Sequence, residues 1–517
     1  MTNRQVWIAD FGSQYTQLIT RKTRELGFSS EIYTVGEVKQ KLLAGQKPNA
    51  LVLSGGPQSV FLDNEDYTVF FQDEKLPILG ICYGMQLLGK YFGGTVYKGH
   101  TGEYGNAQIQ FVNDFKIKDC PPKMNVWMSH SDHVAKTPTD FYVIMESTNN
   151  FTGAIKHKFR PIVGLQFHPE VEHTVHGKEI LRYFYKEIAG LKKDWTAKTM
   201  LKEARHEVMK IKDHYVLCAF SGGVDSLVAA TLSKDILNQK LFCFFVDNGL
   251  LRPQDYKHID VLKEETGLNI EIIDAKEDFY TACRGIHDPE LKRKAIGKTF
   301  IEVFEKKVHE FEKNRAIQFE YLLQGTLYPD VIESITPHAN GGKSVTIKSH
   351  HNVGGLPERM KLKLLEPLRW LFKDEVRKLG VELGLSHDWV YRHPFPGPGI
   401  GIRVLGELSI EAINKVQQSD QILFEELHNY NLYSSVWQAF TVFLPVKTVG
   451  VKGDSRAFEA VICVRVVNSV DAMTATWSDL PREFMIQISS RICNEVPGIT
   501  RVVYDITNKP PGTIEWE

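Results

Sequence analysis

Two short segments carry the residue types of a cysteine nucleophile and its proton acceptor. Residues 80–84 read Gly-Ile-Cys-Tyr-Gly directly after an apolar run, so we expect Cys82 at a sharp strand-to-helix turn. The amino end of a helix favours a thiolate at that place. His168 and Glu170, in the sequence His-Pro-Glu, follow another apolar run. This pattern predicts that His168 takes the thiol proton and that Glu170 orients the imidazole.

A third segment supplies groups for the oxyanion that such a nucleophile creates. Ser54-Gly55-Gly56-Pro57 follows the apolar run Leu51–Leu53, and the backbone N–H groups of its glycines could bind an oxyanion. A single buried cysteine is usually only a small apolar side chain. Three such segments, each after an expected strand, favour catalysis over that simpler interpretation.

A glycine-rich turn later in the chain has the features of a phosphate loop. It lies between an apolar strand and a helix, and its residues are Ser221, Gly222, Gly223, Val224, Asp225 and Ser226. The glycines let successive N–H groups surround an anion at the amino end of a helix, and the serine hydroxyls can bind phosphate oxygens. We expect Asp225 either to orient the loop or to join the ligands of Mg²⁺. The alternative is an ordinary helix N-cap turn.

Periodic patterns predict the elements that hold these residues. Short apolar runs alternate with amphipathic stretches, which is typical of parallel α/β sheets. The expected strands include Val6–Ala9, Ala50–Leu53, Ile78–Cys82, Ile162–Phe167, Tyr215–Phe220 and Leu241–Val246. We predict an α/β fold with two parallel-sheet domains, residues 1–195 and 196–392, followed by a smaller α+β domain, residues 393–517.

Composition limits the remaining functions. The 517 residues carry 62 Lys and Arg against 63 Asp and Glu, a net charge of −1, which argues against nucleic-acid and anionic-membrane partners. No apolar run approaches the length of a transmembrane helix, and no secretory leader is apparent. The seven cysteines are far apart in sequence, which favours free thiols and a cytoplasmic location. Pro337–Pro357, rich in glycine and lysine, predicts a long loop that could act as a lid.

Several motifs together identify a family. Gly-Ile-Cys-Tyr-Gly-Met-Gln with His-Pro-Glu resembles class I glutamine amidotransferases, and residues 221–226 resemble the loop of N-type ATP pyrophosphatases. IKSHHNVGGLP (347–357), RHPFPGPGIGIRV (392–404) and KPPGTIEWE (509–517) are more specific. With them, the chain resembles glutamine-hydrolysing GMP synthases almost from end to end.

The resemblance implies a reaction and a role for each motif. Cys82 would attack the carboxamide of glutamine, with Tyr83, Gly55 and Gly56 holding the oxyanion and Gln86 contacting the substrate. ATP and Mg²⁺ on residues 221–226 would adenylylate xanthosine 5′-monophosphate (XMP), and ammonia would then displace AMP to give GMP. The residues that the family uses for XMP correspond here to Arg293, Gln438, Asp454, Lys509 and Glu515. Lys348 would neutralise charge on the adenylylated intermediate when the lid closes.

The resemblance also implies a homodimer that pairs through the third domain, and we expect neither zinc nor haem. Two other functions remain open at this point. A similar phosphate loop occurs in sulfur-transfer enzymes that modify tRNA, but the net charge and the lack of paired cysteines weigh against them. A non-catalytic sensor would be expected to lose Cys82 or Asp225, and both are present.

Overall fold

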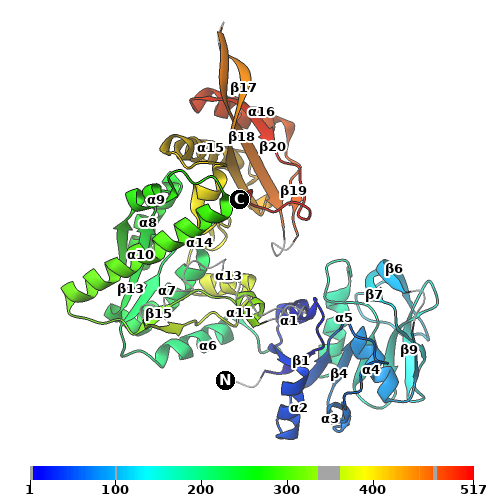
Figure 1. Ribbon diagram of the computed structural model, residues 1–517. Helices are drawn as coiled ribbons and strands as arrows, with labels where there is room; N and C mark the ends of the chain where they lie inside the picture. Colours follow the sequence, from blue (N-terminus) through cyan, green and yellow to red (C-terminus); the bar gives the residue numbers. More distant parts are fainter. Residues whose placement is uncertain (1–3, 99–101, 336–360, 453–454, 470–473) are drawn as a thin grey trace. The chain divides into compact units, whose positions relative to one another are not determined.

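The computed structural model describes residues 4–98, 102–335, 361–452, 455–469 and 474–517 (Figure 1). The chain folds as two compact units, Met1–Thr199 and Met200–Glu517. The first contains Cys82 and His168, and the second contains residues 221–226 and the C-terminal motif. Among the helices of the described ranges, none combines the length and the apolar character needed to cross a membrane.

Five of the nine strands of the sheet in the first unit are parallel, as the apolar runs predict. Its strands follow the order β2-β1-β3-β4-β11. Their bounds are β1 Val6–Asp10, β2 Ser30–Thr34, β3 Ala50–Leu53, β4 Ile78–Ile81 and β11 Ile162–Leu165. Every residue of β3, β4 and β11 is buried, which explains why their sequences are continuously apolar rather than alternating.

Helices cover both faces of this parallel half. Ile19 and Ile180 pack with Val6 and Ile8 on one face, whereas Val38 and Met85 belong to the cluster on the other face. The helices of the first face are α1 Thr16–Glu25, α5 Gly177–Tyr183 and the π-helical turn Phe184–Ile188. Those of the second face are α2 Val35–Leu43, α3 Thr68–Phe71 and α4 Tyr83–Tyr91.

The other half of the sheet is antiparallel, a feature that the sequence patterns did not predict. Four strands continue the sheet in the order β10-β9-β6-β7. Their bounds are β6 Glu103–Phe111, β7 Lys123–His130, β9 Phe141–Ser147 and β10 Thr152–His157, and β5 Thr95–Tyr97 pairs separately with β8 His133–Lys136. Burial alternates along β7, so its apolar residues are interrupted by polar ones and give no continuous run.

The second unit begins with a parallel five-stranded sheet that confirms the second α/β pattern. The strand order is β14-β13-β12-β15-β16. The strands are β12 Val216–Ala219, β13 Leu241–Asp247, β14 Ile270–Asp274, β15 Tyr321–Leu323 and β16 Lys363–Leu365. The helices around it are α6 Ala197–Met209, α7 Val224–Leu237, α8 Pro253–Thr266, α9 Lys276–Cys283, α10 Pro289–Arg315, α11 Tyr328–Ile335, α13 Lys373–Glu382 and α14 His387–Val390.

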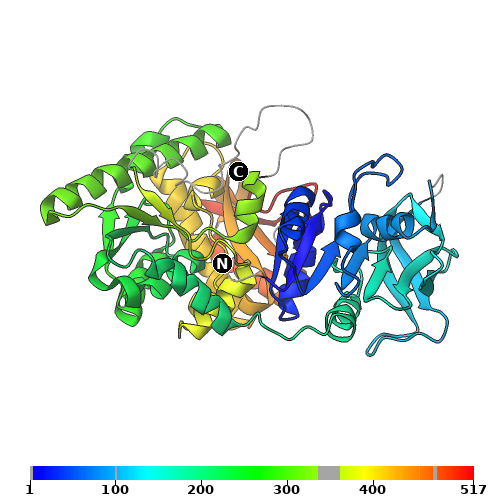
Figure 2. The same cartoon turned by 90° about the horizontal axis from the view of Figure 1, so that it is seen from below.

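A second sheet lies in the C-terminal part of the same unit (Figures 1 and 2). It contains β17 Gln438–Lys452, β18 Ser455–Asn468, β19 Thr476–Trp477 and β20 Ile499–Tyr504. Helices α15 Ile410–Asn429 and α16 Arg482–Glu495 pack on it through a shared apolar cluster. The sheet has two antiparallel pairs, β17 with β18 and β18 with β19, and one parallel pair, β18 with β20. Together with the two helices, it agrees with the α+β pattern of the sequence.

Candidate functional sites

Cys82 lies on the turn between β4 and α4. Its backbone has a positive φ of +51°, a conformation that residues other than glycine rarely adopt. Its N–H donates a hydrogen bond of 2.7 Å to the carbonyl of Leu165 on the neighbouring strand. No side chain fits at the two flanking glycines, Gly80 and Gly84. A Cβ atom at Gly84 would lie 2.4 Å from the Leu53 carbonyl oxygen, and one at Gly80 would lie 2.6 Å from the Gly84 backbone. The turn therefore places the buried thiol at the carboxyl end of β4.

His168 and Glu170 follow β11, which pairs with β4 in parallel register, Leu165 opposite Ile81. The imidazole Nδ1 lies 2.7 Å from Oε1 of Glu170, and both side chains are buried. Burial opposes a charged imidazole, but the Glu170 carboxylate and the contact with Cys82 outweigh it and raise the pKa of His168 to about 10. At neutral pH, His168 is therefore protonated and is suited to donating a proton.

Backbone amides of two loops lie beside this triad. A Cβ atom at Gly55 would lie 3.1 Å from Cε1 of His168, so the turn after β3 approaches the imidazole closely. Gly84 donates its N–H to the Ser54 carbonyl at 3.2 Å, which ties this turn to the start of α4. Gly56 also packs against the backbone of Phe11. Tyr83 is the first residue of α4, where backbone N–H groups lack helical partners.

Asp63, which the sequence analysis missed, fixes the position of Tyr83. Its hydroxyl donates to the carboxylate of Asp63, and Tyr67 donates to the same oxygen at 2.6 Å. These hydrogen bonds lower the pKa of Asp63 against the opposing effect of its burial. Lys90 adds a hydrogen bond of 3.1 Å to the backbone carbonyl of Asp63. The residue after the nucleophile is thus anchored at the far end of its side chain.

The carboxyl end of β7 and the turn that follows it form the other part of the site that no motif predicted. The Cys82 thiol lies 3.7 Å from the carbonyl of Ser129, and the side-chain amide of Gln86 donates to the carbonyl of Asp132 at 2.7 Å. Ser59 donates to the Asp132 carboxylate at 2.5 Å. Gln86, for which contact with glutamine stays a prediction, is buried and binds this segment. It therefore positions the wall of the site in this structure.

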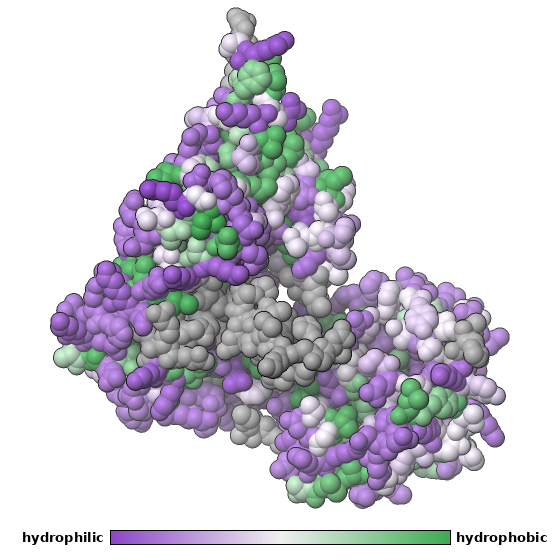
Figure 3. Space-filling model, in the orientation of Figure 1, coloured by the Kyte–Doolittle hydropathy of each residue, from purple (hydrophilic) through white to green (hydrophobic). Residues whose placement is uncertain are grey.

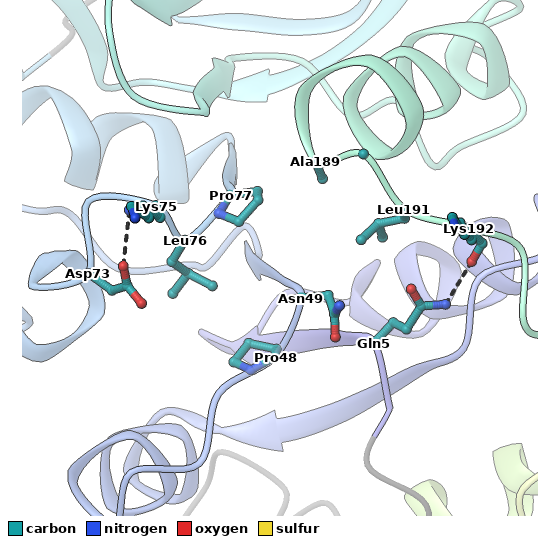
Figure 4. A pocket seen from close by; sticks show the side chains of 11 residues that line it. Gln5, Pro48, Asn49, Asp73, Lys75, Leu76, Pro77, Ala189, Leu191 and Lys192 are labelled. Atoms are coloured by element: carbon teal, nitrogen blue, oxygen red, sulfur yellow. Dashed lines mark hydrogen bonds between the residues drawn. The ribbon is translucent and has the colours of Figure 1, made fainter.

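A cavity of about 510 Å³ in the same unit lies away from this chemistry (Figure 4). Gln5, Asn49 and Pro77, which help to line it, directly precede β1, β3 and β4. Cys82 follows the last residue of β4, at the opposite ends of the same parallel strands. The cavity is thus separate from the candidate catalytic site.

The predicted phosphate loop joins β12 to α7. Gly222 has a positive φ of +73°, and Gly223 is the N-cap residue of α7. The hydroxyl oxygens of Ser221 and Ser226 lie 3.0 Å apart, and the Ser226 hydroxyl donates to the Gly223 carbonyl at 3.0 Å. Val224 begins the helix. The loop thus brings two hydroxyls together at the amino end of a long helix, which is an arrangement that suits a phosphate.

Asp225 is the residue of this loop that fits a magnesium ion. Its Oδ2 atom pairs with Lys373 at 2.5 Å, at the start of α13. Its Oδ1 atom is buried and accepts no hydrogen bond in the described part of the chain. A free carboxylate oxygen beside a phosphate loop is a suitable Mg²⁺ ligand, because Mg²⁺ in such sites takes one or two carboxylates together with phosphate oxygens and water. The described residues contain no cluster of three or more His, Cys, Asp or Glu side chains that could hold a metal.

Two of the residues expected to bind XMP meet at the C-terminus. The side-chain amide of Gln438 donates to Glu515 at 2.9 Å, and Arg403 holds the same carboxylate with two hydrogen bonds of 2.9 and 3.1 Å. Arg293 donates to the carbonyl of Glu517. Arg403, which is buried, lies inside the motif at residues 392–404, and nothing in that motif predicted this contact.

Arg465 organises the turn that carries Lys509. Its buried guanidinium donates to the carbonyls of Thr507 and Thr513 at 2.5 and 3.0 Å, on either side of that lysine. The Lys509 backbone also pairs with Ala475. Asp454 and the lid residue Lys348 lie outside the described residues. The structure thus brings Gln438 and Glu515 into contact and places Lys509 on the adjoining segment.

Three family models match separate parts of the chain. A model of class-I glutamine amidotransferases matches residues 7–188. A model of the phosphoadenosine phosphosulfate reductase domain matches residues 215–314, and a model of the GMP synthase C-terminal domain matches residues 425–516.

Whole-length relatives are similar throughout. The glutamine-hydrolysing GMP synthase of Chlorobaculum tepidum is 48% identical over 528 residues, covering 99% of both chains. Those of Thermosipho africanus and Aquifex aeolicus are 47% and 46% identical, with at least 99% of each chain covered.

Proposed function

The chain belongs to the family of glutamine-hydrolysing GMP synthases, and from this premise we propose how its residues divide the reaction. The protein is a ligase that makes GMP with glutamine as the nitrogen donor and ATP as a substrate. The observation that carries the division is the triad of Cys82, His168 and Glu170 in one unit and the phosphate loop in the other. We assign ammonia production to the first site and nucleotide chemistry to the second.

In the first site, Cys82 attacks the carboxamide carbon of glutamine as a thiolate. His168 holds the corresponding proton, since Glu170 and the thiol raise its pKa to about 10. The N–H groups of Gly55, Gly56 and Tyr83 stabilise the tetrahedral oxyanion. His168 then gives its proton to the leaving nitrogen, which releases ammonia and leaves a thioester on Cys82. Water activated by His168 hydrolyses the thioester to glutamate.

In the second site, residues 221–226 bind the phosphates of ATP. The C2 oxygen of XMP attacks the α-phosphorus and pyrophosphate leaves, which converts a poor leaving group into a good one. Ammonia then displaces AMP at C2 to give GMP. Arg293 and Lys509 suit the XMP phosphate, whereas Gln438, Asp454 and Glu515 suit its base and ribose. Lys348 of the lid neutralises charge on the adenylylated intermediate.

Mg²⁺ is the metal ion that we assign to the ATP site. The Oδ1 atom of Asp225 supports its binding, because it is a hard oxygen without a hydrogen-bond partner among the described residues and belongs to the residue that precedes Ser226 in the loop. When bound, the ion neutralises phosphate charge. Lys373 holds the other carboxylate oxygen and fixes the orientation of the side chain. Neither zinc nor haem enters the proposal.

Isotope-labelled glutamine tests both sites at once. The purified full-length protein is incubated with XMP, ATP, Mg²⁺ and amide-¹⁵N glutamine, and the products are separated by mass spectrometry. We expect ¹⁵N-labelled GMP with equal amounts of AMP, pyrophosphate and glutamate. Glutamate without GMP would retain the cysteine site and refute the assigned acceptor. ADP in place of AMP would refute cleavage between the α and β phosphates.

The domain organisation is also a proposal. We assign residues 1–195 to the amidotransferase, 196–392 to the ATP pyrophosphatase and 393–517 to a dimerisation and XMP-binding domain. The three matched regions support this order. The free thiols of all seven cysteines support a reducing, cytoplasmic compartment.

Exposed apolar side chains support a homodimer that pairs through the third domain. Val449 on β17 lies opposite Phe458 on β18, and these side chains are 50% and 62% exposed. Val451, two residues along the same strand face, is 75% exposed. Figure 3 shows apolar side chains gathered along this sheet. Exposed apolar surface of this kind marks an interaction site.

Sedimentation of the full-length protein tests this pairing. We expect a dimer at micromolar concentration for the unmodified chain and a monomer for Val449→Asp combined with Phe458→Asp. Ile410→Asp, at an exposed apolar residue of α15, is the control and should remain a dimer. A monomeric unmodified chain would refute the proposal.

A further inference from the structure

A pocket of about 320 Å³ in the second unit lies between the amino end of α8 and one side of α15. The residues that matter for its chemistry are Arg252, Lys257, His258, Arg392, Phe424 and His428. None of the residues assigned above to glutamine, ATP or XMP lines it. Its function is therefore open.

Positive charge exceeds negative charge around this pocket. Arg252 and Arg392 share one carboxylate, Asp255, at 2.9 and 2.5 Å. Lys257 adds a further positive charge, and it forms no ion pair or hydrogen bond with any other residue that the structure describes. Glu425, the acidic residue of the lining, is paired with Arg491 at 2.8 Å. Asp255 and Asp420 outweigh burial at Arg252 and raise its pKa, so the positive charge that lacks a matching carboxylate is that of Arg392 and Lys257.

The environment of Arg392 shows the same imbalance. Burial lowers the pKa of this guanidinium, and repulsion from Arg252 adds to the effect, although Asp255 opposes it. Burial, followed by repulsion from Arg392, also lowers the pKa of His258. A buried positive charge that is only partly compensated is stabilised by an anion that fills the space beside it.

The donors on this wall are available and held in place. Arg392 makes one side-chain hydrogen bond among the described residues, to Asp255, whereas a guanidinium carries five N–H donors. Arg252 lies 4.6 Å above the ring of Phe395 and 4.8 Å from that of Phe424. His428 stacks on Tyr433 with the ring centres 4.4 Å apart. Stacking restricts these side chains, so a ligand would lose little free energy in ordering them.

We propose that this pocket is a binding site for a phosphate group, distinct from the ATP and XMP sites. Two guanidinium groups and an ammonium group match a tetrahedral dianion, because forked N–H donors can each reach two of its oxygens. A single carboxylate would neutralise less of the charge. The volume accommodates inorganic phosphate or a small phosphate monoester, and the two sources share the same recognised group.

The proposed XMP site is close, so the test must separate the two. The Phe395 ring lies between Arg252 and Arg403, at 4.6 and 5.1 Å, and Arg403 holds Glu515. Titration calorimetry of the full-length protein at fixed ionic strength is therefore performed with inorganic phosphate and, in a second arm, with ribose 5-phosphate. Lys257→Glu changes the pocket. Lys263→Glu, an exposed residue of the same helix outside the pocket, makes the same change in charge as a control.

We expect Lys257→Glu to weaken phosphate binding by about tenfold or more and Lys263→Glu to leave it unchanged. Lys509→Ala, in the proposed XMP site, should also retain binding. The tighter of the two ligands identifies the source of the phosphate. Equal weakening by Lys257→Glu and Lys263→Glu would indicate only a general charge effect and would overturn the proposal. Binding lost in Lys509→Ala alone, or no binding of either ligand at millimolar concentration, would also overturn it.

Discussion

The proposed cysteine site takes its candidate reacting side chains from the ends of two hydrogen-bonded strands, whereas the proposed XMP site draws on α10, β17 and the C-terminal segment. Cys82 and His168 are fixed by β4 and β11, which pair residue by residue in parallel register. Glu515 is held instead by side chains, Gln438 and Arg403. The difference shows that a strand edge can position a catalytic group through its backbone, while a chain terminus needs buried charged partners.

This comparison predicts different responses to substitution. Removing one reacting atom from the cysteine site should abolish the use of glutamine. The nucleotide site should remain intact. A site held together by several side chains should lose activity more gradually. Because both nitrogen sources use the nucleotide site, its variants should affect them equally. Activity with glutamine and with added ammonia therefore distinguishes the two regions.

The largest effect is expected for Cys82→Ala. Glutamine-dependent GMP formation should fall by about 10⁴-fold or more, since no other group forms the thioester. Ammonia-dependent GMP formation should be unchanged. Both rates are measured with XMP and ATP, using glutamine or ammonium chloride. Cys120→Ala, a half-buried thiol of the same unit, is the control. An equal loss of both activities in Cys82→Ala would show that the sites are not separable.

Glu170→Gln should lower glutamate release by about 10²-fold or more and change its pH dependence. Glu170 helps to raise the pKa of His168 to about 10, so the protonated imidazole is present below that pH and is lost as the pH rises through it. Without the carboxylate, the alkaline fall in rate should occur at a lower pH. Initial rates of glutamate release across neutral and alkaline pH measure it.

Glu172→Gln, at an exposed residue two positions further, should retain the alkaline limb of the unmodified protein. If Glu170→Gln retains the same limb as well, Glu170 does not control the protonation of His168.

Glu515→Gln should reduce kcat/KM for XMP by about 30-fold, because the two hydrogen bonds from Arg403 lose their charged acceptor. The reduction should be the same with glutamine and with ammonia, which is the property that separates this site from the first. Glu483→Gln, an exposed residue of α16, should change neither. A loss confined to glutamine would place Glu515 in the wrong site.

The sequence predicts those features that depend on neighbours along the chain. Ala50–Leu53 is a strand as expected, and the turn around Cys82 follows from Gly80 and Gly84, which a side chain could not replace. The pairing of His168 with Glu170 could also be predicted, because the two residues are close in sequence and their side chains are in direct contact after β11.

Contacts between distant residues account for what the sequence analysis missed. Lys373 pairs with Asp225, which is 148 positions away in the sequence. The sequence around neither residue predicts this ion pair. Arg465 on β18 binds carbonyl groups of the terminal turn, so its role follows from backbone atoms that carry no sequence signal. The antiparallel half of the first sheet was missed for a related reason, since alternating burial leaves no continuous apolar run in β7. The hydrogen bond between Tyr83 and Asp63 is another contact between distant residues that the sequence analysis missed.

Asp63→Asn is expected to have the smallest effect, about fivefold on kcat for glutamine. The carboxylate accepts hydrogen bonds from Tyr67 and Tyr83, and the backbone N–H of Tyr83 is a proposed oxyanion donor. Asp63 is thus a positioning residue that acts through Tyr83. Since the oxyanion forms only in the transition state, kcat should fall while KM for glutamine changes little. Glutamate release at varied glutamine concentration separates the two constants.

Two further variants decide whether Asp63 acts through the phenol. Tyr83→Phe, which removes the hydroxyl but keeps the ring, should reproduce the fall in kcat. Glu65→Gln changes an exposed carboxylate of the same loop that pairs with Lys39, and it should have no effect. Ammonia-dependent synthesis should be unchanged in all three variants. A change in KM with kcat intact would mean that Asp63 shapes the glutamine pocket rather than the oxyanion site, because substrate and transition state would then lose binding equally.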